Sequence, residues 1–229
     1  MTVDEIVAWL AERRASEHDL AGMARYGINT ESAFGVKQPE LCALAKRIGR
    51  DHDLASGLWA AGWRESRLLA AMIDEPGRVT RAQMDRWAGD FDSWDVCDGV
   101  CLDLFRRTPH AWEKAREWPR AERGFVRRAG LVLIAVAAKC DDVDQDAPLL
   151  HLLPLVLAAA EDERNEVKKG ASWALRNLGK RNGALHAAAL EAAGRLRESG
   201  SRAARWVGSD ALRELDSDKV RQRLGDAVR

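Results

Sequence analysis

Residues 125–137 read FVRRAGLVLIAVA, and residues 166–180 read EVKKGASWALRNLGK. Each segment opens with charged residues and continues as an apolar helix that is rich in small side chains. Residues 65–73, ESRLLAAMI, repeat the pattern. Hydrophobic residues in all three recur with the 3.6-residue period of an α-helix. These segments therefore predict a chain built from repeated helical hairpins.

The rest of the chain has the same helical period and few of the β-branched runs that strands favour. Arg128 and Lys169 hold corresponding places 41 residues apart, within the roughly 40–47 residues of HEAT and armadillo units. We therefore expect an all-α, HEAT-like or armadillo-like solenoid, whose charged second helices line a concave, basic surface. Turn signals fall at residues 27–39, 75–77, 108–109, 119, 141–148, 179–183 and 198–200. They mark off about ten short helices, and the lack of a Ser/Gly-rich linker predicts a single domain over residues 1–229.

Charge is unevenly distributed, although the formal net charge of the 229 residues is zero. Between Arg164 and Ser209 there are ten Lys or Arg residues and three acidic residues, a local excess of seven positive charges. This carboxy-terminal part is a candidate anion-binding face. The alternative is that these charges only solvate helix surfaces.

Several functional classes find no support in the sequence. The cysteines form no CxxC pair and the histidines are scattered, so we expect reduced thiols, no metal and no cofactor. No Gly-rich phosphate loop or nucleophile elbow is present, which weakens kinase, dehydrogenase and hydrolase interpretations. The amino terminus does not resemble a signal peptide, and no stretch approaches the roughly 18 apolar residues of a membrane span. The expected location is the bacterial cytoplasm or nucleoid.

The thiols expected to be reduced are those of the four cysteines, Cys42, Cys97, Cys101 and Cys140.

The segment SWDVCD at 93–98 is the first candidate site. Trp94 and Asp98 lie four residues apart and so project from one helix face, whereas Asp95 must point elsewhere. An aromatic face beside a carboxylate suits a cationic substrate. The alternative is that Trp94 belongs to the core and Asp98 is an exposed helical acid.

Two further helices carry candidate anion-binding residues. In FVRRAG, either Arg127 or Arg128 must lie near the buried side, where it could clamp a phosphate or pair with a carboxylate to tie two helices together. In the segment at 166–180, Lys169, Trp173 and Arg176 align on one stripe. A basic stripe with an aromatic residue suits a nucleic-acid backbone. Lys168, Lys180 and Arg181 extend the basic character of this stripe.

Taken in order, these segments resemble the AlkD type of DNA alkylation-repair glycosylase, a family of HEAT-like repeat proteins. The resemblance covers nearly the whole chain. Its motifs are MARYGINTESAFGVKQPELCALAKRIG at 23–49, FDSWDVCD at 91–98, FVRRAG at 125–130, ASWALRNLGK at 171–180 and RAARWVGSDALREL at 202–215.

The resemblance implies that the protein excises positively charged N3- or N7-alkylated purines from double-stranded DNA, without flipping the base into a pocket and without an obligate protein partner. Asp98, Trp94 and Trp173 would carry catalysis. The residues implied to contact DNA are Arg128, Tyr26, Lys168, Lys169, Arg176, Lys180 and Arg181.

One departure from the family pattern concerns DNA affinity, because Leu41 and Cys42 stand where relatives often carry an Arg. Two other functions remain open. A non-catalytic HEAT-like protein could bind branched or distorted DNA, although the presence of Trp94 and Asp98 speaks against it. A protein-binding scaffold would predict exposed apolar or acidic ridges instead of a basic carboxy-terminal third.

Overall fold

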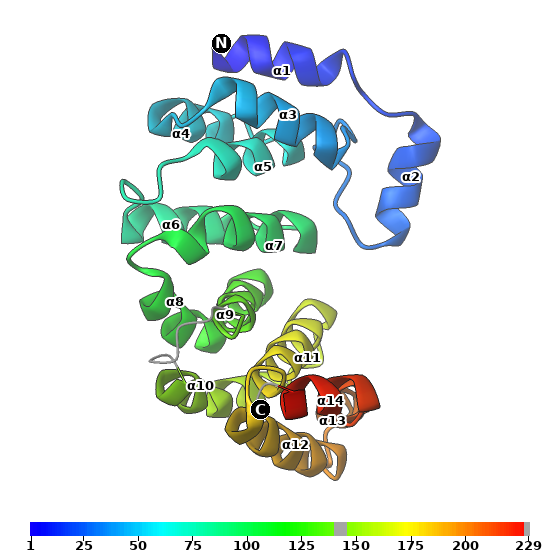
Figure 1. The fold of residues 1–229 in the computed structure, drawn as a ribbon. Helices are drawn as coiled ribbons and strands as arrows, with labels where there is room; N and C mark the ends of the chain where they lie inside the picture. Colours follow the sequence, from blue (N-terminus) through cyan, green and yellow to red (C-terminus); the bar gives the residue numbers. More distant parts are fainter. Residues whose placement is uncertain (140–145, 227–229) are drawn as a thin grey trace. The chain divides into compact units, whose positions relative to one another are not determined.

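The computed structural model describes residues 1–139 and 146–226, and every regular element in those residues is a helix (Figure 1). The predicted all-α class is therefore confirmed. Cys140 and residues 141–145 of one predicted turn lie outside the described residues. The first helices are α1 (Val3–Ala11), α2 (Glu17–Arg25), α3 (Gln38–Ile48), α4 (His52–Ala60), α5 (Arg64–Ile73), α6 (Arg81–Gly89) and α7 (Trp94–Asp103), followed by the 3-10 helix η1 (Phe105–Arg107). The others are α8 (Ala111–Glu117), the 3-10 helix η2 (Trp118–Arg120), α9 (Gly124–Ala137), α10 (Asp146–Ala159), α11 (Asn165–Gly179), α12 (Gly183–Arg197), α13 (Arg202–Leu215) and α14 (Asp218–Asp226).

The described residues contain fourteen α-helices, more than the ten expected. The extra helices arise at short turns whose signals in the sequence are weak. At one of them, Gly49 ends α3 with a φ of 81°, and the Asp51 side chain caps α4 by accepting a hydrogen bond from the Leu54 N–H. The turn predicted at 141–148 extends too far, because residues 146–148 already belong to α10.

The chain divides into two compact units, Met1–Ala111 and Trp112–Arg229. The expectation of a single domain over residues 1–229 stays a prediction. No helix among the described residues is both long and apolar enough to cross a membrane.

In the first unit, α5 is the central helix and packs against α3, α4 and α7. Leu68, Leu69 and Ile73 of α5 are buried. Helix α7 comes close to α5 because Gly99 has no side chain: a Cβ atom there would lie 2.7 Å from Leu68 Cδ2. This close contact fixes α7, which carries the predicted Trp94 and Asp98.

In the second unit, α11 is central and packs against α9, α10, α12 and α13. Helix α9 is buried continuously from Arg128 to Val136. Gly130 lets α9 lie directly against η2, since a Cβ atom there would stand 2.4 Å from Pro119 Cδ. The three segments whose repetition predicted the fold are thus α5, α9 and α11, and each carries buried apolar residues of its unit.

Candidate nucleic-acid interface

Trp94 begins α7 and is partly open to solvent, with 38% of its surface exposed. Its indole N–H donates a hydrogen bond of 2.9 Å to the backbone carbonyl oxygen of Tyr26. Tyr26 is itself 79% exposed and follows directly after α2. The indole is therefore held at the surface by its edge, which is a suitable arrangement for contact with a ligand.

Asp98 lies one turn further along α7 and is only 9% exposed. The two side chains thus differ in surroundings: the indole is accessible and the carboxylate is sheltered. A sheltered carboxylate interacts more strongly with a nearby positive charge than one in bulk water does. The interpretation of Asp98 as an exposed helical acid is wrong, as is that of Trp94 as a core residue.

Asp95 points away from this pair, as its position on the helix predicts. It accepts hydrogen bonds from Arg64 Nε and from the Ser93 hydroxyl, each at 2.5 Å. Arg64 also pairs at 2.7 Å with Glu65, a fully buried carboxylate that accepts from the backbone N–H groups of Phe34 and Gly35. This network joins α5, α7 and the loop after α2.

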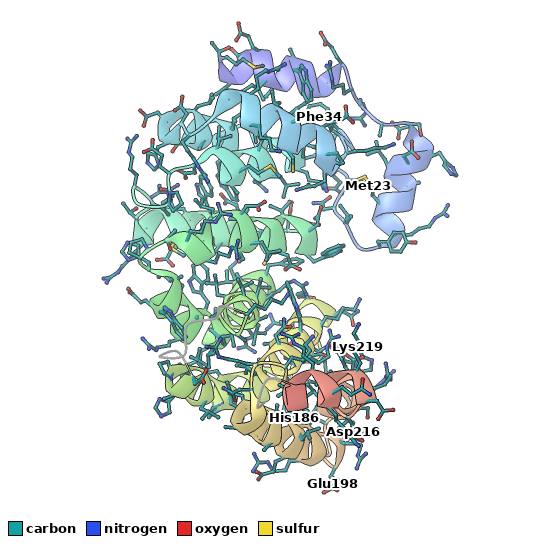
Figure 2. All side chains as sticks on the ribbon, viewed as in Figure 1. Met23, Phe34, His186, Glu198, Asp216 and Lys219 are labelled. Atoms are coloured by element: carbon teal, nitrogen blue, oxygen red, sulfur yellow. The ribbon has the colours of Figure 1, made fainter. Side chains whose placement is uncertain are left out.

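The same loop is fixed by two further contacts. Phe34 packs against the Trp63 ring with centroids 4.3 Å apart, and its place in the loop is labelled in Figure 2. The Asn29 backbone N–H donates to the Ser93 hydroxyl at 3.2 Å. The loop that follows Tyr26 is therefore tied to the amino-terminal end of α7.

Leu41 and Cys42, the expected departure from the family pattern, occupy different surroundings in α3. Leu41 is fully buried in the core, and Cys42 is exposed with a free thiol. Of these two positions, only Cys42 lies on the surface. An arginine that contacts a phosphate would therefore have to stand at position 42. Whether its absence weakens DNA binding stays a prediction.

Arg128 is the arginine on the buried side of α9, with 7% exposed, whereas its neighbour Arg127 is half-buried. Its guanidinium donates a 2.9 Å hydrogen bond to the backbone carbonyl of Glu166, in the first turn of α11. The aliphatic stem of Arg128 packs against Gly170 of α11, where a Cβ atom would stand 3.5 Å from Arg128 Cγ, an ordinary contact distance. Arg128 therefore helps to tie α9 to α11 through a carbonyl group, a kind of partner that the sequence did not indicate.

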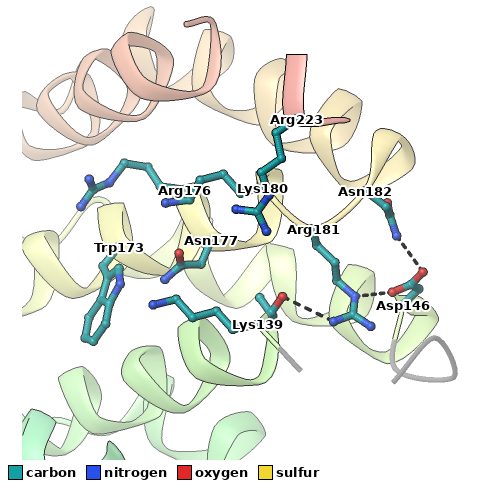
Figure 3. A pocket seen from close by; sticks show the side chains of 10 residues that line it. Lys139, Asp146, Trp173, Arg176, Asn177, Lys180, Arg181, Asn182 and Arg223 are labelled. Carbon is teal, nitrogen blue, oxygen red and sulfur yellow. Dashed lines mark hydrogen bonds and ion pairs between the residues drawn. The ribbon is translucent and has the colours of Figure 1, made fainter. Parts of the chain in front are cut away.

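Trp173, Arg176, Lys180 and Arg181 do come together, in a hollow of about 700 Å³ beside the second half of α11 (Figure 3). The Lys139 ammonium lies 5.7 Å from the centre of the Trp173 ring. This is within the range of a cation–π interaction. Sequence reasoning missed three other residues that line the hollow: Lys139 lies after α9, Arg223 on α14 and Asn177 on the buried side of α11.

Helix α11 also contacts α13, and there two basic residues that line the hollow meet acids. Arg176 pairs with Glu214 at 2.5 Å and approaches Asp210 at 3.6 Å. Lys180 pairs with Glu214 as well. The stretch of sequence with a positive excess ended at Ser209, one residue before Asp210. The excess overstates the positive charge that this face presents.

Glu214 is ionised in this arrangement. Burial acts to raise the pKa of Glu214, but the hydrogen bonds from Lys180 and Arg176 outweigh it and hold the pKa below its ordinary value. A permanent negative charge therefore lies between two cations of the stripe. Near the start of α11, Lys169 is exposed, and the Lys168 ammonium lies 5.8 Å from the ring centre of the exposed Trp206.

Comparisons with known proteins bear on this arrangement. A family model described as DNA alkylation repair enzyme matches residues 11–215. A solved structure, described as belonging to a new family related to the HEAT-like repeat DNA glycosylases with affinity for branched DNA structures, is similar with a TM-score of 0.77. It shares 20% sequence identity and covers 98% of this chain and 97% of its own. No curated protein matches the sequence.

A designed armadillo repeat protein in complex with a (KR)4 peptide is similar over 83% of this chain and 80% of its own, with 16% identity and a TM-score of 0.40. That likeness is too weak to bear on the fold. The similarity to the structure related to the HEAT-like repeat DNA glycosylases shows a HEAT-like repeat fold, so the predicted HEAT-like architecture is confirmed. The basic concave surface stays a prediction.

Proposed function

Because the chain belongs to the DNA alkylation repair enzyme family, we propose that it is a DNA glycosylase for positively charged N3- or N7-alkylated purines in duplex DNA. The observation that carries the proposal is the pair on α7: an accessible Trp94 indole and, one turn on, a sheltered Asp98 carboxylate. We further propose that the base is excised without entering a protein pocket.

The chemistry of the substrate explains why these two groups suffice. Alkylation at N3 or N7 makes the purine cationic, so that it leaves as a neutral base with the electron pair of the glycosidic bond. Positive charge then develops on the sugar, and the Asp98 carboxylate stabilises it and orients or deprotonates the water that attacks the anomeric carbon. Trp94 supplies an aromatic face to the cationic sugar, and Trp173 is the second aromatic residue that we propose for catalysis.

Phosphate binding falls to the basic residues. Arg128, Lys168, Lys169, Arg176, Lys180 and Arg181 are the proposed contacts, with Tyr26 beside Trp94 as an aromatic contact. Cations at these positions would release counterions from DNA and supply affinity that is independent of base sequence. Arg176 and Lys180 contribute less to DNA affinity than two free cations would, because each pairs with Glu214.

The decisive experiment replaces Asp98 by Asn and measures release of 7-methylguanine from duplex DNA under single-turnover conditions. We expect the rate to fall by on the order of 100-fold or more, as for the loss of other electrostatic groups aimed at developing charge. DNA affinity should be kept or improved, since a carboxylate repels phosphates. The control is Asp92→Asn, an exposed acid two residues before Trp94.

Near-normal excision by Asp98→Asn would show that Asp98 has no catalytic role. A second function is favoured by the structural neighbour described as having affinity for branched DNA. The protein would then bind branched or distorted DNA without catalysis. Wild-type protein that releases no alkylated base but binds a four-way junction more tightly than a linear duplex would establish this second function.

A further inference from the structure

The hollow beside α11 has features that duplex backbone contacts do not require. It is formed by the second half of α11, the carboxy-terminal end of α9, the start of α10 and Arg223 of α14 (Figure 3). Its volume of about 700 Å³ is in the range of sites that hold small organic ligands. Its charged lining residues are Lys139, Asp146, Arg176, Lys180, Arg181 and Arg223.

Among the described side chains of the hollow, two cations have no acidic partner. Glu214 pairs with Arg176 and Lys180, and Asp146 pairs with Arg181. Among the side chains that the structure describes, which leave out residues 140–145 and 226–229, Lys139 and Arg223 have no acidic partner within ion-pair distance. Both lie on exposed parts of the chain. Two positive charges at one site favour a ligand with two negative charges.

Asn177 supplies an independent sign of a ligand. Its side chain is only 3% exposed, and its Nδ2 donor is buried without a hydrogen-bond partner among the described residues. A buried donor without a partner costs roughly 1–3 kcal/mol. Figure 3 shows this carboxamide beside the Trp173 indole, with Lys139 and Arg223 reaching toward the same region. An acceptor oxygen placed there would satisfy the amide and both cations.

Trp173 adds an aromatic face to the same hollow. Its side chain is half-buried, and the Lys139 ammonium lies 5.7 Å from its ring centre. Indole faces stack on nucleobases of any sequence, and such stacking contributes about 1–3 kcal/mol per base. The hollow therefore combines an anion site with a place for one planar ring.

We propose that this hollow binds a nucleotide that carries a terminal phosphate, with the phosphate monoester between Lys139, Arg223 and Asn177 and the base against Trp173. A monoester carries close to two negative charges at neutral pH, which matches the two unbalanced cations. An internal phosphodiester carries one. The inference rests on the proposed function, since it names the kind of DNA group that this part of the interface takes.

The phosphate monoester can come from the end of a DNA strand or from a free nucleotide, and the experiment separates these sources. Short single strands with a fluorophore at the 3′ end are prepared with a 5′-phosphate or a 5′-hydroxyl, and their affinities are measured by fluorescence anisotropy. We expect the phosphorylated strand to bind the wild-type protein about tenfold more tightly, in line with charge-assisted hydrogen bonds. Deoxyadenosine monophosphate and deoxyadenosine are then tested as competitors.

Matched variants locate the effect. Arg223→Ala should reduce the preference for the phosphorylated strand, and the double variant with Lys139→Ala should abolish it. Lys219→Ala removes an exposed cation from the same helix, α14, outside the hollow, and should leave the preference intact (Figure 2). Asn177→Ala should also lower the preference without lowering stability, because it removes a donor that has no partner among the described residues.

If the strands bind equally but the monophosphate competes better than the nucleoside in the wild type and not in the double variant, the ligand is a free nucleotide. Equal binding of both strands together with no such competition overturns the proposal. The proposal is also overturned if Lys219→Ala reduces the preference for the phosphorylated strand as much as Arg223→Ala does. Release of 7-methylguanine is measured with the same protein preparations. If no base is released, the glycosylase proposal is overturned, but the preference for the phosphorylated strand is still measured independently.

Discussion

Arg128, a proposed phosphate contact, also supports the fold. It is almost completely buried and donates to the Glu166 carbonyl of α11, while its stem fits against Gly170. We predict that Arg128→Ala lowers the stability of the DNA-free protein by about 2 kcal/mol, because a charged hydrogen bond and buried stem packing are lost. Urea unfolding measures this. Unchanged stability would mean that the contact to Glu166 does not support the fold.

The sequence predicted part of this residue-level arrangement. Helical spacing was enough to place Trp94 and Asp98 on one face of α7 and to turn Asp95 away. Spacing could not predict that the Trp94 indole donates to Tyr26, because those residues are 68 positions apart and meet only through the loop after α2. It also left open which partner Arg128 would take.

At the scale of elements, the turn between α10 and α11 depends on Asp162. Its carboxylate accepts hydrogen bonds from Arg164 and from Arg127 of α9. Hydrogen bonds from Arg164 are the main reason that its pKa falls to about 2, against an ordinary 3.8. A depressed pKa stabilises the fold above the ordinary value, and this contribution is lost as the pH falls toward 2.

We therefore predict that Asp162→Asn destabilises the protein at pH 7 by about 1 kcal/mol, a value that allows for solvent screening of Arg164. The difference from wild type should shrink as the pH is lowered from about 4 toward 2. Urea unfolding over this pH range tests it. Glu191→Gln, which breaks only the exposed pair with Arg195, should change stability little at any pH. A pH-independent difference at Asp162 would contradict the assignment.

The pairing of α11 with α13 marks the limit of sequence reasoning about elements. Periodicity correctly placed Trp173 and Arg176 together on α11, because a helix fixes which side chains share a face. The acids that neutralise Arg176 and Lys180 lie on another helix, with Glu214 38 residues beyond Arg176. Only tertiary packing brings them together, so a count of charges along the chain could not include them correctly.

For the whole molecule, DNA affinity should depend on how much of this basic charge is free. We predict that Glu214→Gln strengthens duplex binding, since it removes a negative charge and releases Arg176 and Lys180 from their ion pairs. The log–log dependence of affinity on salt should become steeper by about one for each additional phosphate that the protein neutralises, and Lys169→Ala should make it shallower by about one. Weaker binding by Glu214→Gln would instead mean that Glu214 positions the two cations for DNA.

Substrate choice follows from the site as a whole. The hollow at the start of α7, lined by Asn29, Ser32 and Arg64 among others, has a volume of about 10 Å³. That is room for about one water molecule and not for a purine. Asp95, the acid nearest Trp94 in the sequence, has its carboxylate engaged by Arg64 and the Ser93 hydroxyl, so it is turned away from a leaving base beside Trp94.

We predict excision of cationic N3- and N7-alkylpurines, with little difference between a methyl and a large N7 substituent, because the cationic base leaves without protonation and a bulky group need not fit a cavity. Neutral lesions such as hypoxanthine and uracil need a proton on the leaving base and should be released negligibly. Single-turnover rates on matched duplexes that differ only in the lesion measure both expectations. Efficient release of uracil, or a sharp loss of rate with the larger substituent, would mean that a base pocket and a proton donor exist, and would contradict excision without flipping.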